Sequence, residues 1–265
     1  MTKRIYVALL LLLAVPALVL AQQPQNYTTI TVKGVSFKMI RVQGGTFTMG
    51  CTSEQGNDCY DREKPAHKVT LSTYYIGETE VTQELWKAVM GSNPSRFIGD
   101  KRPVEQVSWD DCQKFIRKLN RLTGKQFRLP TEAEWEFAAR GGTKSLHYKY
   151  SGSNDLNVVA WYRGNAYDKG ESSPDYVTHV VKTKKPNELG IYDMSGNVEE
   201  LCSDRYGNYT DAAQTNPQGA SSGSCRVGRG GSWGYDARYC RSSNRDNGST
   251  NIRSSGLGLR LVLLP

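Results

Sequence analysis

The sequence predicts an α+β domain with little regular secondary structure. Glycine is abundant, with 26 residues in a chain of 265, and 38% of the residues are hydrophobic, which suffices for a globular core. Three short stretches between residues 83 and 139 have helical periodicity, whereas beyond about residue 143 no helical period persists for more than two turns. We found no linker and no internal repeat, so residues 36–265 are best treated as one domain.

The N-terminus has the pattern of a signal peptide. Lys3 and Arg4 precede an apolar run from residue 5 to residue 20, and small residues up to Ala21 suit cleavage before Gln22. We therefore expect residues 1–21 to be removed and the protein to be exported to the periplasm, the cell surface or the medium. Residues 22–35 would form a leading arm or an edge strand. No later apolar run approaches the length of about 20 residues that spans a bilayer, so we expect no transmembrane segment after signal removal.

Strands are expected at three places in the first third of the chain. Residues 28–39 and 69–76 each have the alternation of a single strand, and residues 42–50 suggest two strands joined at Gly44 and Gly45.

Three helices follow, each with a start and a stop signal. Thr82 caps residues 83–90 and Ser108 caps the second helix, whose apolar face is Cys112, Phe115, Ile116, Leu119 and Leu122 before Gly124. Thr131 and Glu134 form a capping box for the third helix, which ends at the pair Gly141 and Gly142. Its acids Glu132, Glu134 and Glu136 are interpreted as complements to the helix dipole rather than as catalytic acids.

The six cysteines fit disulfide chemistry in an oxidising compartment. They are Cys51, Cys59, Cys112, Cys202, Cys225 and Cys240, and all lie in the exported part. Cys51 and Cys59 flank a short polar loop that a disulfide would close. Cys240 is expected to pair with Cys202 or Cys225, or else to be a free, low-pKa thiol. The three histidines are scattered, so a zinc site of the usual spacing is not expected.

Six motifs resemble those of the formylglycine-generating enzyme (sulfatase-modifying factor) family, in the family order. They are GGTFTMG at 44–50, ETEVT at 78–82, PVEQVSW at 103–109, RLPTEAEWEFA at 128–138, GIYDMSGNVEE at 190–200 and RGGSW at 229–233. The resemblance implies an irregular α+β fold related to C-type lectins. It does not by itself imply an activity, since one fold hosts many functions.

The resemblance also implies a copper site that this chain departs from. Active members hold Cu(I) with two thiolates after the Gly-Gly-Ser motif, and these positions are Tyr235 and Cys240 here. A phenol is a poor ligand for a soft ion, so copper chemistry is doubtful. The family's two aromatic residues near Asn197 are replaced by Glu199 and Leu201. Ser232 would be a pocket residue by resemblance, or part of a tight turn.

A calcium site is also implied by the resemblance. Its ligands would be the side chains of Asp193 and Glu200 and the main-chain carbonyls of Gly196 and Val198. Hard cations prefer several oxygen ligands, and this motif is intact. The alternative is that Asp193 caps a turn and Glu200 is a paired surface acid.

Two functions are compatible with these motifs. The first is an exported, calcium-stabilised module that binds a protein, peptide or glycan without the family's copper chemistry. The second is an active oxidase that converts a sulfatase cysteine to formylglycine using Cys240. A nucleic-acid partner is not expected, because the net charge of +8 comes from dispersed residues.

Overall fold

The computed structural model describes residue 2 and residues 26–265, so the expected signal peptide lies outside the described residues. A five-stranded sheet has the order β1-β2-β5-β12-β6. Its strands are β1 (Tyr27–Val32), β2 (Val35–Val42), β5 (Tyr74–Gly77), β12 (Val262–Leu263) and β6 (Phe127–Arg128). The prediction of one strand over 28–39 is wrong, because Lys33 and Gly34 adopt positive φ angles of 46° and 83° and turn the chain back into the β1–β2 hairpin.

Two smaller sheets complete the β structure. One has the order β10-β9-β7-β11 and the other β3-β4-β8. Their strands are β7 (Glu199–Arg205), β9 (Cys225–Arg229), β10 (Arg245–Ser249), β11 (Leu257–Gly258), β3 (Gly45–Met49), β4 (His67–Leu71) and β8 (Gln214–Thr215). The single strand expected over 69–76 is instead β4 and β5, in different sheets. The break occurs at Ser72 and Thr73, where side-chain oxygens replace main-chain oxygens as hydrogen-bond acceptors. Asn216 Oδ1 accepts from the Ser72 amide, and Thr73 Oγ1 accepts from the Gly44 amide.

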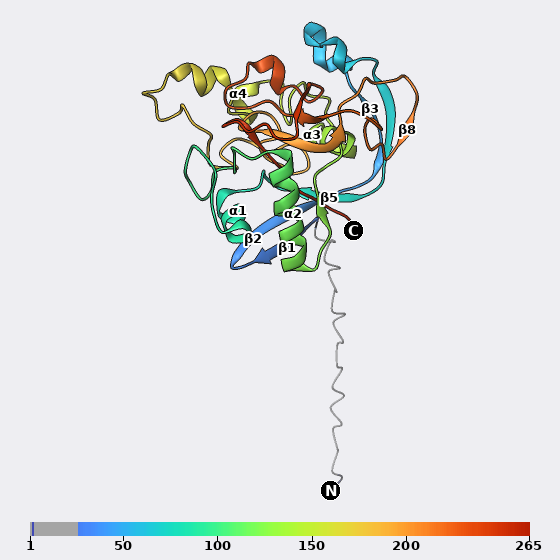
Figure 1. The fold of residues 1–265 in the computed structure, drawn as a ribbon. Helices are drawn as coiled ribbons and strands as arrows, with labels where there is room; N and C mark the ends of the chain where they lie inside the picture. The colour runs from blue at the N-terminus through green and yellow to red at the C-terminus, as the bar shows by residue number, and fades with distance from the viewer. Residues whose placement is uncertain (1, 3–25) are drawn as a thin grey trace.

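The three predicted helices are present with their caps. They are α1 (Gln83–Met90), α2 (Trp109–Thr123) and α3 (Glu132–Ala139), and a fourth, α4 (Leu156–Val159), has a single turn. The short 3₁₀ segments are η1 (Ser53–Asp58), η2 (Asp61–Glu63), η3 (Gly142–Lys144), η4 (Arg163–Asn165), η5 (Tyr167–Lys169) and η6 (Ala237–Cys240). Helices α1 and α2 pack on β1 and β2 (Figure 1). No helix in residues 26–265 is long and apolar enough to cross a membrane.

The apolar face of α2 ends one turn earlier than predicted. Leu122 is 47% exposed, whereas the other four residues of the predicted face are buried. After Gly124 the chain returns to β6 on the side of Asn120, whose amide group bonds both the amide and the carbonyl of Phe127. Because Asn120 and Leu122 lie on different sides of the helix, this return leaves Leu122 uncovered.

Buried ion pairs tie the helices and sheets together. Four arginines are at most 2% exposed, and each meets a buried glutamate: Arg229 with Glu136, Arg241 with Glu63, Arg245 with Glu132, and Arg260 with Glu200. Glu132 and Glu134 lie in the first turn of α3, where acids complement the helix dipole as predicted, but the three acids of this helix also form ion pairs. Arginines from distant parts of the sequence pair with Glu132 and Glu136 inside the protein, and Glu134 pairs with Arg128.

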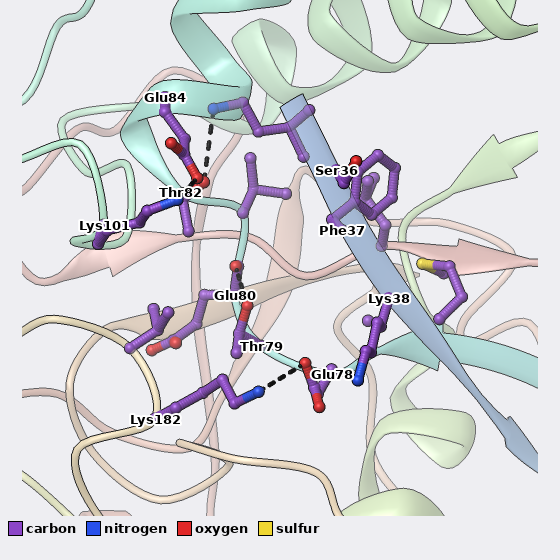
Figure 2. A pocket seen from close by; sticks show the side chains of 16 residues that line it. Ser36, Phe37, Lys38, Glu78, Thr79, Glu80, Thr82, Glu84, Lys101 and Lys182 are labelled. Atoms are coloured by element: carbon purple, nitrogen blue, oxygen red, sulfur yellow. Dashed lines mark hydrogen bonds and ion pairs between the residues drawn. The ribbon is translucent and has the colours of Figure 1, made fainter. Parts of the chain in front are cut away.

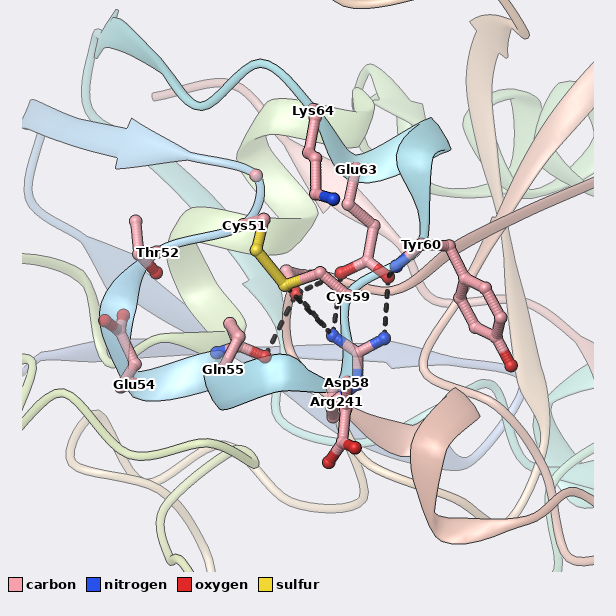
Figure 3. The surroundings of a disulfide bond; sticks show 12 residues. Cys51, Thr52, Glu54, Gln55, Asp58, Cys59, Tyr60, Glu63, Lys64 and Arg241 are labelled. Atoms are coloured by element: carbon pink, nitrogen blue, oxygen red, sulfur yellow. Dashed lines mark hydrogen bonds and ion pairs between the residues drawn. A yellow bond between two sulfur atoms is a disulfide. The ribbon is translucent and has the colours of Figure 1, made fainter.

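The predicted disulfide between Cys51 and Cys59 is confirmed. It closes η1 beside the buried pair of Glu63 and Arg241 (Figure 3). In Figure 3 the Arg241 side chain approaches Glu63 next to the two sulfur atoms. The disulfide therefore lies next to the segment that follows Cys240.

Removing this disulfide should destabilise the protein moderately. The sequence separation is 8 residues, and closing so short a loop stabilises the folded state by about 2.5 kcal/mol. The double variant Cys51→Ala/Cys59→Ala should lose that amount in urea unfolding. Wild type measured with a reductant should show the same loss, and unchanged stability in both would show that the bond does not constrain the unfolded chain.

Candidate functional site

The Gly-Gly-Ser motif and the residues that follow it lie partly at a cavity and partly in the core. Ser232 and Tyr235 line a cavity of about 180 Å³, whereas Cys240 is not among the residues that line it. Tyr235 is 37% exposed, and Ser232 is 3% exposed. The loop therefore does not place the phenol and the thiol together at one accessible surface.

Cys240 is buried among apolar side chains. It packs with Tyr150, Leu156, Val159 and Ala160, and it is fully shielded from solvent. Burial, followed by the nearby charges of Asp236 and Glu199, raises the pKa of the Cys240 thiol to about 12. A thiol with this pKa is almost entirely protonated at neutral pH, so Cys240 is not a reactive nucleophile in this environment.

The predicted disulfide of Cys240 is not formed. Cys202, Cys225 and Cys240 are all free, as is Cys112. The physical reason is that the core separates them: Cys202 belongs to the apolar cluster around Trp135, whereas Cys240 belongs to the cluster around Tyr150. Cys240 therefore stays reduced without being accessible.

Two acids lie in the cavity beside Ser232 and Tyr235. Glu199 is half-buried at the start of β7, and Asp246 is in β10. Burial and then the charge of Asp246 raise the pKa of Glu199 to about 8, against a weaker opposing influence of Arg62. The charge of Glu199 is in turn the largest influence that raises the pKa of Tyr235.

Aromatic side chains surround the same loop. Trp233 packs against Phe97, Tyr167 and Tyr176, with ring centroids 5.1, 5.6 and 5.0 Å away. On the other side of the motif, Tyr235 lies 5.4 Å from Tyr239. Trp233 itself is buried, whereas Tyr167 and Tyr235 are exposed on the two sides of the motif.

The expected calcium ligands lie in one buried turn. Asp193 accepts a hydrogen bond from the Lys182 amide at 2.8 Å through one oxygen, and its other oxygen is buried without a partner. Burial is the main cause that raises the pKa of Asp193 to about 6. Gly196 has a φ of +79°, and a Cβ there would lie 2.1 Å from the Trp161 carbonyl oxygen, so only glycine fits.

Glu200 is occupied by protein donors rather than being free. Arg260 donates to both of its oxygens at 2.6 to 3.0 Å, and Trp135 Nε1 donates at 2.7 Å. The remaining Arg260 donors reach the carbonyl oxygens of Gly77 and Tyr192. The interpretation of Glu200 as a paired surface acid is thus half right: the residue is paired, and it is 1% exposed.

A third carboxylate lies close to this turn. Glu80 is 2% exposed, and neither of its oxygens has a hydrogen-bond partner in the described chain. Burial and the charge of Asp193 raise its pKa well above the usual value.

Glu80 also borders a cavity of about 260 Å³, where Lys182 pairs with Glu78 at 2.9 Å (Figure 2). Within residues 26–265, no group of three or more His, Cys, Asp or Glu is arranged to hold a metal through side chains alone.

The fold and this arrangement define a sulfatase-modifying-factor domain. Residues 28–264 match the Sulfatase-modifying factor enzyme 1-like domain, so the chain belongs to that family. The fold is the irregular α+β, C-type-lectin-like fold that the motifs predicted.

Three comparisons place the chain within the family. Chaperone protein LppX of Paenibacillus barcinonensis is 33% identical over 270 residues, covering 86% of this chain and 90% of that protein. The formylglycine-generating enzyme of Streptomyces coelicolor is 29% identical over 283 residues, covering 83% and 87%. Among solved structures, Treponema denticola variable protein 1 superimposes with a TM-score of 0.80 and 38% identity, covering 91% of this chain and all of that one.

Sequence reasoning missed three residues of the site. The motif comparison identifies Glu199 only as the residue that replaces a family aromatic. An acid at the first position of a buried strand is itself a signal of a functional residue. Asp246 and Arg260 gave no signal, because their roles depend on strand register and on packing between distant segments.

Proposed function

We propose that this protein is an exported, non-catalytic member of the family that binds a protein, peptide or glycan through the surface around Ser232 and Tyr235. The observation that carries the proposal is the separation of Tyr235, at the cavity, from Cys240, in the core. The signal-like N-terminus and the Cys51–Cys59 disulfide support export, because disulfides persist in oxidising compartments. The similarity to a relative that carries the name of a chaperone protein supports a protein ligand.

Copper does not fit the residues at the family position. Cu(I) requires soft ligands, and the two positions supply a phenol, which is a hard donor, and a single thiol that is fully shielded from solvent. Gly231 also packs closely on the thiol, since a Cβ there would lie 2.9 Å from Cys240 Sγ. We therefore assign no reaction step to copper in this chain.

One observation favours the alternative of an active oxidase. Cys240 is a free thiol, as catalysis would require, instead of part of a disulfide. Its burial and raised pKa argue against this role, because the thiol would have to become exposed before it could react.

A Cu(I) competition titration tests the proposal. The protein, reduced under anaerobic conditions, is titrated against a chromogenic Cu(I) chelator, with the Streptomyces coelicolor enzyme as the positive control. We expect this protein to leave the chelator complex intact. Removal of one equivalent of Cu(I) by wild type, but not by Cys240→Ala, would contradict the proposal.

Calcium is the cofactor that we propose for the turn at Asp193. The unpartnered oxygen of Asp193 and the two of Glu80 are buried carboxyl oxygens, and a hard cation would give such oxygens a partner. Asp193 and the carbonyl oxygens of Gly196 and Val198 would hold the ion, and Glu200 would support the site through its pair with Arg260 unless the ion displaces Arg260. The ion would supply structural stabilisation only.

The Asp193→Asn variant tests this cofactor. In wild type, calcium should raise the melting temperature relative to chelator, because it binds the folded state alone. In the variant that increment should disappear. Without calcium, the stability of wild type should fall as pH rises from about 4 through about 6, because the pKa of Asp193 is raised in the folded state, so the folded protein disfavours its charged form. An equal increase of the melting temperature by calcium in both proteins would show that calcium does not bind at this turn.

A further inference from the structure

We propose that the cavity lined by Glu199, Ser232, Tyr235 and Asp246 binds an organic cation on an aliphatic stem, such as the end of a lysine or arginine side chain of a partner protein. The two carboxylates would be its counter-ions. This inference rests on the proposed function, because it specifies the ligand chemistry of the same surface.

The strand register brings the two acids to one face of the sheet. Gly228 of β9 lies directly opposite Asp246 of β10 and Leu201 of β7. Residues directly opposite in antiparallel strands point to the same face, and Glu199 shares that face because it precedes Leu201 by two. Gly228 has no side chain, and the Glu199 carboxylate covers it: a Cβ there would lie 2.7 Å from Glu199 Cδ.

Neither acid has a cationic partner within the described chain. The ion pairs found within 4.0 Å in residues 26–265 include neither Glu199 nor Asp246, although 17 such pairs are present. Arg62 influences Glu199 electrostatically, but its guanidinium stacks 4.5 Å from the Tyr60 ring and donates to Asn244 Oδ1. The cavity therefore keeps two carboxylates without a counter-ion, and an incoming cation would supply one.

A buried hydroxyl also faces the cavity. Ser232 is 3% exposed and lines the cavity, and its hydroxyl takes part in none of the side-chain hydrogen bonds found in residues 26–265. It packs under Gly256, where a Cβ would lie 2.8 Å from Ser232 Oγ. This hydroxyl is an additional acceptor for a ligand N–H group.

The remaining walls suit an aliphatic stem. Leu201, Leu257 and Ile252 line the cavity, and the Tyr235 ring stands beside them. Aliphatic contacts would bury methylene groups, and an aromatic ring attracts a cation over its face. A cavity of about 180 Å³ has room for a side-chain end but not for a larger ligand.

An NMR titration with small probes tests the inference. Isotope-labelled full-length protein is titrated at millimolar concentrations with n-butylguanidinium, n-butylammonium and the neutral n-butylurea, which matches the guanidinium in shape. We expect the two cations to shift the amide signals of Gly228, Asp246 and their neighbours, and butylurea to leave them unchanged. Equal binding of butylurea, or binding of none of the probes, would overturn the inference.

Matched variants distinguish binding in the cavity from nonspecific attraction of the cation to the charge of the protein. Glu199→Gln and Asp246→Asn should each weaken butylguanidinium binding at least tenfold, whereas Glu171→Gln, an exposed acid outside the cavity, should not. Circular dichroism checks that each variant folds. If one cavity variant does not fold, the other one still tests the inference. Unchanged affinity in a folded cavity variant would contradict the assignment.

Failure of all cation tests would leave the proposed function standing, because that function is tested separately by copper binding and by turnover.

Discussion

Replacing Glu200 with glutamine should lower the free energy of unfolding by about 3–5 kcal/mol, equally in calcium and in chelator. Arg260 is fully buried, and Glu200 is its charged partner. Removing one member of a buried pair leaves the other charge without compensation, which costs more than losing a surface pair. Trp135 would also lose a charged acceptor for its indole N–H.

Urea unfolding measures this loss directly. Glu84→Gln is the matched control, because Glu84 pairs with Lys101, whose side chain is 64% exposed, and such a pair contributes at most about 1 kcal/mol. A loss for Glu200→Gln that occurs only in calcium would contradict the prediction. It would show that Glu200 acts chiefly as a metal ligand and that Arg260 leaves it when the ion binds.

The second large effect concerns Arg241, the residue after Cys240. Arg241→Met should also cost about 3–5 kcal/mol, because it leaves Glu63 buried and charged without its partner. Arg241 donates to both oxygens of Glu63, at 2.7 and 2.6 Å, beside the Cys51–Cys59 disulfide (Figure 3). The same variant should increase the rate at which a thiol reagent labels Cys240, since the segment loses its attachment.

A double-mutant cycle is the control for this pair. The double variant Glu63→Gln/Arg241→Met should lose less stability than the sum of the two single variants, because it leaves no unpaired charge. Additive losses would show that the two side chains act independently. Unchanged labelling of Cys240 in Arg241→Met would show that the thiol is protected by its apolar neighbours alone.

Local signals predicted the helices and one disulfide well. The caps at Thr82, Ser108 and Thr131 are present because each hydroxyl accepts from an amide three residues later, which is a short-range interaction. The Cys51–Cys59 bond could be inferred for the same reason, as both cysteines belong to one loop. The family motifs gave the fold, because they extend over nearly the whole domain.

Long-range packing accounts for what the sequence did not reveal. No local pattern indicates that Arg245, 113 residues away, pairs with Glu132, so the sequence predicted only the interaction of the α3 acids with the helix dipole. Likewise Glu199 and Asp246 meet only because β9 lies between β7 and β10 with Gly228 in the middle. The thiols of Cys202 and Cys240 could be counted from the sequence, but their separation by the core could not.

Turnover of a sulfatase-type peptide is the most direct test of the central claim that this family member binds rather than oxidises. Purified protein is incubated with Cu(I), oxygen, reductant and a cysteine-containing peptide, and the peptide is analysed by mass spectrometry, with the Streptomyces coelicolor enzyme as the positive control. We predict that the control forms the aldehyde and that this protein leaves the cysteine unchanged. Aldehyde formation by wild type that is lost in Cys240→Ala would contradict the account.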